Sequence, residues 1–589
     1  MSAAPGALLA VVRGPAGLGL ADGERAWAVP AAGPAAAARV LADLERERSP
    51  RWVWWSAREV LGPLAGHGGR DDRPPHLARA WDVAAVHRLV AGGGDDGPAA
   101  ARAVACGLAP SAAPSPGQLD LGGDGGVPDG DGDDPVRPDG HLRPEWVDGS
   151  WADTPGRAAR WAAAALGTAG LQRERLVATA GEHAVVTAWS ESAAAVLAVE
   201  LEASGVPFDV AAARRAVEAV VGPLPEDEAG AARSRAARDA PLQRLLGPGP
   251  TGAPVDLRSP AQVLDALARA GLDLPDTRSW RLERLAEEPG APAVLRSLVA
   301  WRQAERLAVA HGPRWLAEHV AGGRLRAAWS ASDGGAGRMT ASAGVHSIPR
   351  ELRDAVRAEP GHLLVRADLG QVEPRVLAVV SGDPALARDA AEDDLYAPVA
   401  ARLRVARDVA KVAVLAAMYG QTSGAAGATM AAMERSYPRA VAMLVDAARR
   451  GAAGEDVRTA GGRLVRVPAV EEVPVEAGPA ALERYRARLA GRGRFARNAV
   501  VQGSAAELFK AWAATVRARL AADGSGAVVL CLHDELLLHV REEDADAVAA
   551  GVVADLGTSA ARWCRAVGGP PVRFTADVAV VDRWSRAKG

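Results

Sequence analysis

In two stretches of the chain, carboxylate side chains follow directly after an apolar segment. The stretch GHLLVRADLGQVEPRVLAVV places Asp368 at the end of the apolar run HLLVRA. The stretch AVVLCLHDELLLHV places His533, Asp534 and Glu535 between two apolar runs. A pair of Mg²⁺ ions needs carboxylates from two separate strand ends, because hard cations take oxygen ligands and complete their shells with water and phosphate oxygens. These spacings therefore predict a site for two Mg²⁺ ions.

Each carboxylate stretch requires its own supporting elements. We expect a strand over residues 362–367 and a helix that begins near Gln371, because Pro374 is tolerated only in the first turn of a helix, where its missing N–H is not needed. Asp368 could instead cap that helix, a role for which aspartate is well suited. His-Asp-Glu between two strands indicates a tight hairpin turn, although an ordinary exposed turn would favour Gly or Asn.

A third stretch, RDVAKVAVLAAMYGQ, combines two cations with an aromatic ring. Arg407, Lys411, Leu415 and Tyr419 follow a four-residue spacing, which predicts one stripe of a helix that ends at Gly420. Two cations one turn apart repel each other unless an anion lies between them, and a triphosphate is such an anion. A solvated basic face is the alternative, and it explains the arginine better than the lysine.

The composition of the chain makes that lysine informative. Lys and Arg together number 69, yet lysine occurs only at 411, 510 and 588, asparagine only at 498 and isoleucine only at 348. This skew is typical of a GC-rich genome, in which Arg replaces Lys wherever the chemistry tolerates the exchange. Lysine carries a compact charge on a titratable ammonium, so we infer that Lys411 is retained for a shape or a proton that arginine does not supply.

Length and charge bound the class of protein. A chain of 589 residues predicts three or four units of ordinary domain size, and 49% hydrophobic with 24% charged residues is typical of a soluble globular protein. The net charge is −3, but residues 107–150 hold nine acidic residues against two arginines, which leaves the remaining chain mildly basic. Any nucleic-acid site must therefore be a local arginine-lined groove.

Cysteine usage and the N-terminal segment indicate the compartment. Cys106, Cys531 and Cys564 are widely spaced and predict neither a disulfide framework nor a metal-binding pair. The N-terminal segment has no basic region before its short apolar run, and no segment reaches 18 uncharged apolar residues. We therefore expect a cytoplasmic protein with no membrane partner.

The chain changes character along its length. Residues 1–90 predict a small α/β unit in which LGLADGERAWAVP forms two strands joined by an Asp-Gly turn. Residues 91–156 are rich in Gly, Pro and Asp and predict a linker or insert, including a DGDGDD run that lacks the pattern of a calcium loop. A helical region follows to about residue 319. Beyond residue 337 short strands alternate with helices, and VRTAGGRLVRVP predicts a hairpin.

Together, the three stretches resemble the motifs of family A DNA polymerases, the bacterial DNA polymerase I type. ADLGQVEPRVLA is similar to the first palm motif, RDVAKVAVLAAMYG to the fingers helix and HDE to the second palm motif. Further similar segments are GRMTASAGVHSIP, VRTAGGRLVRVP, RFARNAVVQGSAAE and ADVAVVDRW. The resemblance covers roughly residues 200–589 in a consistent order, which is more specific than any single motif.

The resemblance implies an α/β multidomain fold, in which an RNase H-like N-terminal domain precedes a right-hand polymerase of palm, fingers and thumb. It implies a DNA-directed DNA polymerase that binds primer-template DNA and dNTPs, as a monomer, in the cytoplasm and nucleoid of a bacterium. The implied boundaries are 1–90 and 157–195 for the exonuclease-like domain, 196–335 for the thumb, 336–395 and 491–589 for the palm, and 396–490 for the fingers.

The resemblance also implies a role for each motif residue. Asp368 and Asp534 would hold two Mg²⁺ ions with Glu535 in support, and Lys411 would donate a proton to pyrophosphate. Glu373 would crowd the 2′ position of the sugar and so favour deoxynucleotides. The residues implied in nucleotide binding are Arg407 and Lys411 on the triphosphate, with Leu415, Tyr419, Glu373 and Gln371. The residues implied in DNA binding are Arg338, Arg494, Asn498, Gln502 and His533.

The sequence departs from the family pattern at several positions. Leu415 stands where the family has an aromatic residue that stacks on the nucleotide. The metal ligands implied by the resemblance are intact, so the departures bear on speed, fidelity and sugar selectivity. The replaced segments are Val414-Leu415-Ala416 for Asn-Phe-Gly, Leu369-Gly370 for Tyr-Ser, and Asp394-Leu395-Tyr396 for Asp-Ile-His.

The N-terminal part is only faintly similar to the 3′–5′ exonuclease domain of the family. RAWDVAAVHRLV resembles the segment that carries one metal-binding aspartate, here Asp82. The Asp-x-Glu pair of the family is missing, because Asp22 and Glu24 fall on the predicted turn, and no Tyr-x-x-x-Asp occurs. Exonucleolytic two-metal chemistry needs several carboxylates, so we expect proofreading to be lost.

Two alternatives stay open. The chain could be a related single-subunit RNA polymerase or reverse transcriptase, although Glu373 favours deoxynucleotides. It could also be a catalytically weak or inactive DNA-binding homologue, although retention of Asp368, Asp534, Arg407 and Lys411 counts against that interpretation.

Overall fold

The computed structural model of the chain describes residues 6–67, 73–109, 133–225, 227–420, 426–474 and 478–587. The chain forms two compact units, each of which is assembled from segments that are distant in the sequence. The larger unit comprises Met1–Gly205, Ala328–Ala341 and Gly361–Val580. The smaller unit comprises Val206–Ala327, Ser342–Pro360 and Val581–Gly589.

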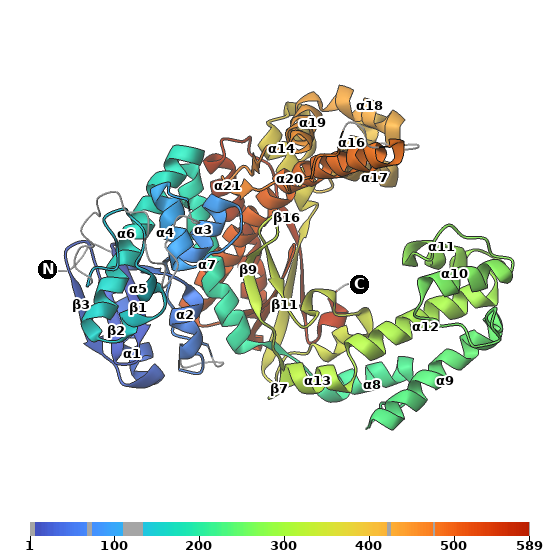
Figure 1. Cartoon of the computed structure of the whole chain (residues 1–589), viewed down its shortest axis with the longest axis horizontal. Helices are drawn as coiled ribbons and strands as arrows, with labels where there is room; N and C mark the ends of the chain where they lie inside the picture. The colour runs from blue at the N-terminus through green and yellow to red at the C-terminus, as the bar shows by residue number, and fades with distance from the viewer. Residues whose placement is uncertain are drawn as a thin grey trace. The chain divides into compact units, whose positions relative to one another are not determined.

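A five-stranded sheet begins the larger unit. Its strands are β1 (Leu8–Gly14), β2 (Gly17–Ala21), β3 (Ala26–Pro30), β4 (Arg51–Trp54) and β5 (Ala80–Asp82), in the order β3-β2-β1-β4-β5 (Figure 1). β1 pairs antiparallel with β2, while β1, β4 and β5 are parallel. The predicted hairpin is confirmed as β2 and β3, and the Asp22 carboxylate closes its turn by accepting hydrogen bonds from the N–H groups of Glu24 and Arg25, each at 3.0 Å.

Helices cover both faces of this sheet because β1 sends alternate apolar side chains into two cores. Leu9 and Val11 belong to a core shared with the first helix, whereas Ala10 and Val12 belong to a core shared with the long helix that follows residue 154. The helices are α1 (Gly33–Arg48), α2 (Ala57–Leu61), α3 (Val83–Ala91), α4 (Pro98–Cys106), α5 (Pro144–Val147), α6 (Pro155–Ala180) and α7 (His183–Ser204).

The range 91–156, predicted to be a linker or insert, is helical on both sides. α4 and α5 lie within it, and Ala101 and Trp146 are buried in the core of the N-terminal sheet. Residues 110–132, which include most of the DGDGDD run, lie outside the described residues. The flanks of this range are therefore part of the N-terminal fold.

α7 is a core helix although it is long and apolar enough to cross a membrane. Of its apolar window, 78% is buried inside the protein. Its two buried carboxylates have cationic partners from the distant residues 463–517. Glu191 lies 2.7 Å from the Lys510 ammonium, and Glu200 lies 2.6 Å from the Arg517 guanidinium. Such pairing is what the burial of a charged group requires.

A second sheet of the larger unit has four strands, in the order β14-β15-β11-β16 (Figure 1). Its strands are β11 (His362–Gly370), β14 (Gly526–Leu532), β15 (Glu535–Arg541) and β16 (Thr575–Val581). β11 pairs antiparallel with β15 from His362 opposite Arg541 to Asp368 opposite Glu535. The predicted strand over 362–367 is confirmed and extends to Gly370, and α14 (Val372–Ser381) follows at once.

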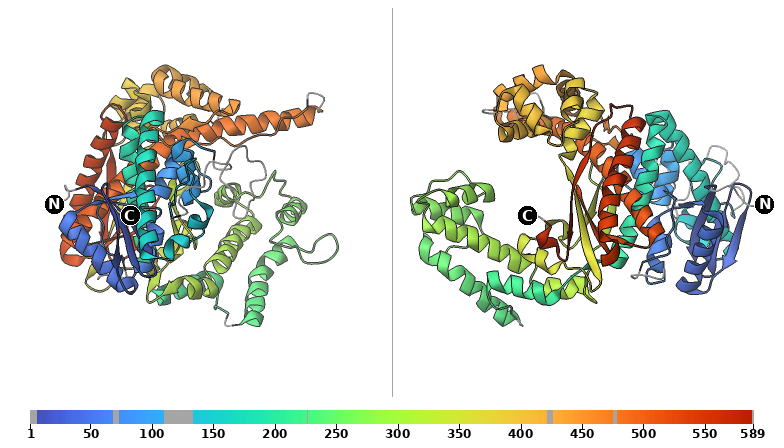
Figure 2. Two further views of the ribbon diagram at one scale, coloured as in Figure 1. Left: turned by 60° about the vertical axis from the view of Figure 1, so that its left-hand side comes forward. Right: turned by 180° about the vertical axis from the view of Figure 1, so that it is seen from behind.

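Helices pack on this sheet and continue beyond it. The longest is α20 (Pro479–Asp523), whose N-terminal half runs beside α19 (Figure 2). The other helices are α15 (Pro384–Asp389), α16 (Tyr396–Leu403), α17 (Arg407–Tyr419), α18 (Ala426–Ser436), α19 (Pro438–Ala453) and α21 (Ala545–Ala566). Two short hairpins complete the unit, β9 (Trp329–Asp333) with β10 (Arg338–Ala341), and β12 (Val457–Arg458) with β13 (Leu464–Val465), which confirms the hairpin predicted at VRTAGGRLVRVP.

The smaller unit is mainly helical. Its helices are α8 (Val210–Val221), α9 (Glu228–Leu246), α10 (Pro260–Arg269), α11 (Ser279–Glu287), α12 (Ala293–Ala310) and α13 (Pro313–His319), and its small sheet has the order β6 (Val206–Pro207), β8 (Arg324–Leu325), β7 (Val320–Ala321). In its core, the indole N–H of Trp301 donates to the Asp239 carboxylate at 2.8 Å, and Arg258 pairs with the same carboxylate at 2.7 Å.

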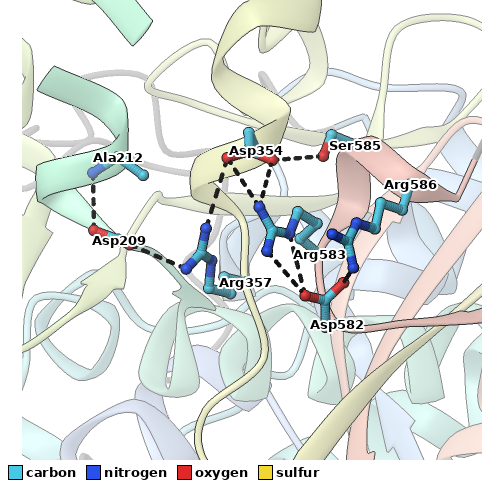
Figure 3. Close-up of polar contacts among 8 residues, drawn as sticks. All are labelled: Asp209, Ala212, Asp354, Arg357, Asp582, Arg583, Ser585 and Arg586. Carbon is cyan, nitrogen blue, oxygen red and sulfur yellow. Dashed lines mark hydrogen bonds and ion pairs between the residues drawn. The ribbon is translucent and has the colours of Figure 1, made fainter. Parts of the chain in front are cut away.

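Charged side chains join the three chain segments of the smaller unit (Figure 3). Asp354 lies 3.1 Å from the Arg583 guanidinium and accepts a hydrogen bond from the Ser585 hydroxyl at 2.9 Å. Arg357 lies 3.6 Å from the same carboxylate and 3.7 Å from that of Asp209. The C-terminal segment is thus held to the start of α8 through a chain of ion pairs.

Candidate active site

Three acidic residues lie at one end of β11 and β15, the two central strands of the four-stranded sheet. Asp368 on β11 is the register partner of Glu535, the first residue of β15. The backbone N–H of Leu369 donates to the carbonyl oxygen of Asp534 at 2.8 Å, which places Asp534 beside the end of β11. His533 and Asp534 form the predicted tight turn, and Glu535 lies in the strand rather than in the turn. Asp534 is exposed and Glu535 is buried.

Asp368 does not cap the helix that follows it. The residue before α14 is Gln371, which has a positive φ of 54° and makes no side-chain capping hydrogen bond. The Asp368 carboxylate pairs instead with the guanidinium of Arg366, two residues earlier on the same face of β11. The capping alternative for Asp368 is therefore wrong.

Arg366 was not predicted as a site residue, yet its buried side chain contacts the carboxylates from the interior of the protein. Its side chain is 1% exposed, and its Nη2 atom pairs with Asp368. Its Nε atom lies 2.9 Å from Glu535 Oε2, without the angle of a hydrogen bond, and its Nη1 atom donates to Asp577 on β16 at 3.2 Å. The sequence signal was present, because an arginine inside the apolar run HLLVRA has to face the same side as Asp368.

The chemistry of these donors fits Mg²⁺ that completes its shell with substrate. Among the described residues, no group of three or more His, Cys, Asp or Glu side chains is arranged as a ready-made metal cage. Mg²⁺ is held in many phosphate-transfer sites by one or two carboxylates together with water and phosphate oxygens. Asp368 and Asp534 supply two such carboxylates at adjacent backbone positions. An incomplete protein shell is therefore what this class of ion requires.

Glu373 joins three other predicted residues into one cluster. Its carboxylate accepts hydrogen bonds from the Arg338 guanidinium at 2.9 Å and from the Tyr419 hydroxyl at 2.8 Å. Burial, and then the negative charge of Glu373, raises the pKa of Tyr419 to about 12, while a hydrogen bond with the Gln502 side chain acts in the opposite direction. The sequence predicted all four residues for the site, and the fold brings them together from β10, α14, α17 and α20.

The helix predicted from the four-residue spacing is confirmed as α17, which ends at Tyr419 with Gly420 in the left-handed conformation at φ 70°. Arg407, expected on the triphosphate, pairs here with Asp394, and its Nη2 atom lies 3.0 Å from Oδ1 of that carboxylate. The hydrogen bond from Arg407 holds the pKa of Asp394 below its usual value. Asp394 also accepts from the Gln371 amide at 2.8 Å, so Gln371 belongs to this polar group.

The remaining residues of the α17 stripe differ in burial. Lys411 is exposed, whereas Leu415 is half-buried and packs against the core of α14 to α20. Val409 and Val412 on the same helix are 45% and 64% exposed, so apolar as well as cationic side chains face solvent there. The Leu415 side chain, at the position where the family has an aromatic ring, is therefore partly packed into the protein core.

The DNA-binding residues predicted on α20 lie on one stripe. Arg494, Asn498 and Gln502 are four residues apart and share a face of the helix. Arg494 is exposed, and the Asn498 amide oxygen is buried without a hydrogen-bond partner among the described residues. His533 lies at the sheet edge, where burial, and then the nearby charge of Arg338, lowers its pKa.

Asp82 in the N-terminal part is engaged by protein donors. Its carboxylate accepts hydrogen bonds from the Trp54 indole at 3.0 Å and from the N–H groups of Ala57 and Ala85 at 2.6 and 2.7 Å. Burial raises its pKa to about 6. These contacts make Asp82 the N-cap of α3. Asp22 closes the β2–β3 turn, so the two residues have separate structural roles.

Comparison with known proteins places the chain in a family. The sequence pattern of DNA polymerase family A matches residues 250–585. The thermostable DNA polymerase I of Thermus aquaticus is 29% identical over 259 residues, which cover 39% of this chain and 30% of that protein. The DNA polymerase I of Rhizobium leguminosarum is 28% identical over 322 residues, which cover 49% of this chain and 28% of that protein. These alignments thus span about a third of the length of these relatives.

A solved structure gives the same indication for the fold. The POL domain of Pol1 from M. smegmatis, in complex with DNA primer-template and dNTP, aligns with a TM-score of 0.64 at 20% sequence identity. The alignment covers 100% of this chain and 97% of that one, so the mixed α/β architecture is shared along the whole length. With the matched family pattern covering more than half of the sequence, the chain belongs to DNA polymerase family A.

Proposed function

We propose that this chain is a template-directed DNA polymerase that adds deoxynucleotides to a primer 3′-OH by two-metal phosphoryl transfer. The observation that supports this most directly is the convergence of Asp368 and Asp534 at one sheet edge. The Pol1 domain of similar fold was solved with primer-template DNA and dNTP, and we propose the same partners here. We also propose that the protein acts as a monomer in the bacterial cytoplasm.

The three carboxylates would have different roles in metal binding. Asp368 and Asp534 would be the ligands, and the buried Glu535 would hold Asp368 in register across the two strands. When bound, two Mg²⁺ ions supply Lewis-acid activation of the primer hydroxyl and stabilisation of the leaving pyrophosphate. The protein supplies the geometry, because Asp368 lies on a paired strand and Asp534 lies in a two-residue turn whose carbonyl oxygen is bonded to the end of that strand.

The cluster around Glu373 would select the nucleotide. Its carboxylate accepts hydrogen bonds from Arg338 and Tyr419, which fix the orientation of the side chain. A fixed carboxylate beside the sugar would exclude a 2′-hydroxyl by sterics and by desolvation. Arg407 and the exposed Lys411 would bind the triphosphate, and Lys411 would donate a proton to the leaving pyrophosphate. Arg407 would have to exchange its contact with Asp394 for the triphosphate.

Proofreading is proposed to be lost. Asp82 accepts hydrogen bonds from three protein donors, which supports a capping role for this carboxylate. Arg58 lines the same pocket as Asp82, and its guanidinium donates to Glu202 at 2.6 Å and to the carbonyl oxygen of Trp329 at 2.7 Å. Two-metal chemistry needs several carboxylates, and the resemblance to the exonuclease supplies Asp82 alone.

Primer extension tests the proposal. The wild-type chain, with a primer-template duplex, Mg²⁺ and dNTPs, is expected to extend the primer, and Asp368→Ala is expected to lose at least about 10³-fold in rate. Asp446→Ala is the matched control, since it removes an exposed carboxylate of α19. Failure of the wild type to extend, or equal extension by Asp368→Ala, would contradict the proposal.

Two further arms separate the alternatives. Replacement of dNTPs by rNTPs distinguishes a single-subunit RNA polymerase, for which ribonucleotides would be incorporated at comparable efficiency. A mispaired primer without dNTPs tests the exonuclease, and shortening of that primer would overturn the loss of proofreading.

A further inference from the structure

A buried arginine lies beneath the carboxylates of the proposed metal site. Arg366 and Asp368 are two residues apart on β11, so both side chains face the same side of the sheet. Glu535 enters this face from β15 and Asp577 from β16, on opposite sides of β11. The guanidinium of Arg366 reaches all three carboxylates, and its side chain is only 1% exposed.

The charge of this cluster is unusual for a metal site. Arginine stays protonated at any physiological pH, so Arg366 contributes a permanent positive charge at a buried position. Its three partners differ in accessibility, because Glu535 is 6% exposed, Asp368 25% and Asp577 79%. Arg366 thus offsets the mutual repulsion of the carboxylates from inside the protein, while their outer sides face solvent.

We propose that Arg366 is a positioning residue that acts as an internal counter-ion of the metal ligands. In the metal-free chain it holds Asp368 and Glu535 in place, and on metal binding it competes with the cation for the electron pairs of Asp368. Removal of its charge would therefore increase the affinity for a divalent cation. This inference rests on the proposed metal site. It adds a residue that sets the concentration of divalent cation at which the site fills.

The third partner gives the guanidinium an alternative contact. Asp577 lies on β16, and the Nη1 atom of Arg366 donates to its Oδ2 atom at 3.2 Å. When a cation engages Asp368, the guanidinium keeps Asp577 and Glu535 as partners and is not left buried without a counter-charge. A buried cation that lost its last partner would be strongly destabilising, so this contact is what makes the exchange feasible.

Direct binding of Mn²⁺ to the full chain, followed by electron paramagnetic resonance of the free ion, tests the inference. Asp368→Ala defines the Mn²⁺ that is bound at the site. Arg366→Met is expected to bind this Mn²⁺ about tenfold more tightly than the wild type, because a unit charge a few ångströms from the ion is removed. Arg366→Lys keeps the charge and is expected to stay close to the wild-type affinity. Arg366→Gln carries the same comparison if the Met variant does not fold.

Thermal unfolding gives a second readout that a purely structural role would not produce. Arg366→Met is expected to lower the melting temperature in the absence of metal and to recover most of that loss in Mn²⁺, since the cation replaces the missing counter-charge. Arg517→Met is the matched control, because it removes a buried arginine of α20 that pairs with Glu200 of α7. Its loss of melting temperature is expected to be the same with and without Mn²⁺.

The outcomes separate this inference from the proposed function. If the wild type binds no Mn²⁺ that Asp368→Ala removes, with or without primer-template DNA, the metal site fails and the role of Arg366 fails with it. If the wild type binds Mn²⁺ at Asp368, but neutral variants of Arg366 bind it equally or more weakly, only the counter-ion role is overturned. A loss of stability in Arg366→Met that Mn²⁺ does not reduce would overturn it as well.

Discussion

The Tyr419 hydroxyl donates a hydrogen bond of 2.8 Å to the carboxylate of Glu373, and so connects the last residue of α17 to the first turn of α14. Arg338 binds the other oxygen of the same carboxylate. The side chain that would test the sugar is therefore held from two sides, by elements that are widely separated in the sequence.

Tyr419→Phe is expected to loosen Glu373 without removing it. The variant should lower the free energy of unfolding by about 1 kcal/mol, the usual cost of one hydrogen bond to a half-buried group. The ratio of kcat/KM for dNTP over rNTP should fall several-fold, because the carboxylate is no longer fixed by the hydroxyl. Single-nucleotide incorporation assays measure this ratio. Tyr485→Phe, on α20, is the control that should leave it unchanged.

Asp394→Asn is expected to release Arg407 toward the triphosphate. The Asp394 carboxylate holds the guanidinium in this structure, so a neutral amide should reduce the apparent KM for dNTP by about threefold. Arg407→Ala should raise that KM by about tenfold or more. Steady-state primer extension checks both variants. A rise in KM for Asp394→Asn would mean that Asp394 orients Arg407 for substrate instead of sequestering it.

Glu507 is expected to make the larger unit less stable as pH rises toward neutrality. It is fully buried on α20, and burial raises its pKa from 4.5 to about 7. Between these values the folded chain binds a proton that the unfolded chain does not, so folding stability falls as pH rises from about 4.5 to 7. The full effect is about 3 kcal/mol.

Glu507→Gln isolates this effect, because the amide does not titrate. Melting temperatures measured at pH 5 and pH 7.5 should show a smaller decline for the variant than for the wild type. The comparison between the two chains removes the contribution of histidines that titrate in the same range. An identical decline in both chains would show that Glu507 ionises in the folded state at its ordinary pKa.

Asp239 is expected to stabilise the smaller unit. It accepts a hydrogen bond from the Trp301 indole and pairs with Arg258, and it is 9% exposed. Asp239→Ala leaves both donors without that partner and should cost about 2 kcal/mol. Asp265→Ala breaks only an exposed pair with Arg269 and should change stability by less than about 0.5 kcal/mol. Urea unfolding monitored by tryptophan fluorescence distinguishes the two.

The sequence was sufficient where function depends on local spacing. The strand that ends near Asp368, the His533–Asp534 turn and the α17 stripe all follow from periodicity and turn chemistry, and each is present in the structure. The grouping of Glu373 with Tyr419 was implied only by resemblance, since 46 residues separate the two side chains.

The sequence was insufficient where long-range pairing sets the environment of a residue. Arg366 lies two residues from Asp368, but its contact with Asp577 spans 211 residues and depends on the strand order of the sheet. The pairing of Arg407 with Asp394 has a similar origin, because the helical stripe does not reveal which carboxylate folds back against it. In α4, a short alanine-rich helix lies within a range whose overall Gly and Pro content predicted a linker.

The length of α20 has a mechanical consequence. At about 1.5 Å per residue, Gln502, which contacts Tyr419, lies roughly 12 Å along the helix from Lys510, which is fixed to Glu191 of α7. α20 is therefore anchored to α7 in its C-terminal half, through Lys510 and Arg517, and the stripe that carries Gln502 lies next to this anchor. The ion pair between α7 and α20 therefore lets the N-terminal segment restrain the position of Gln502 and, through it, of Tyr419.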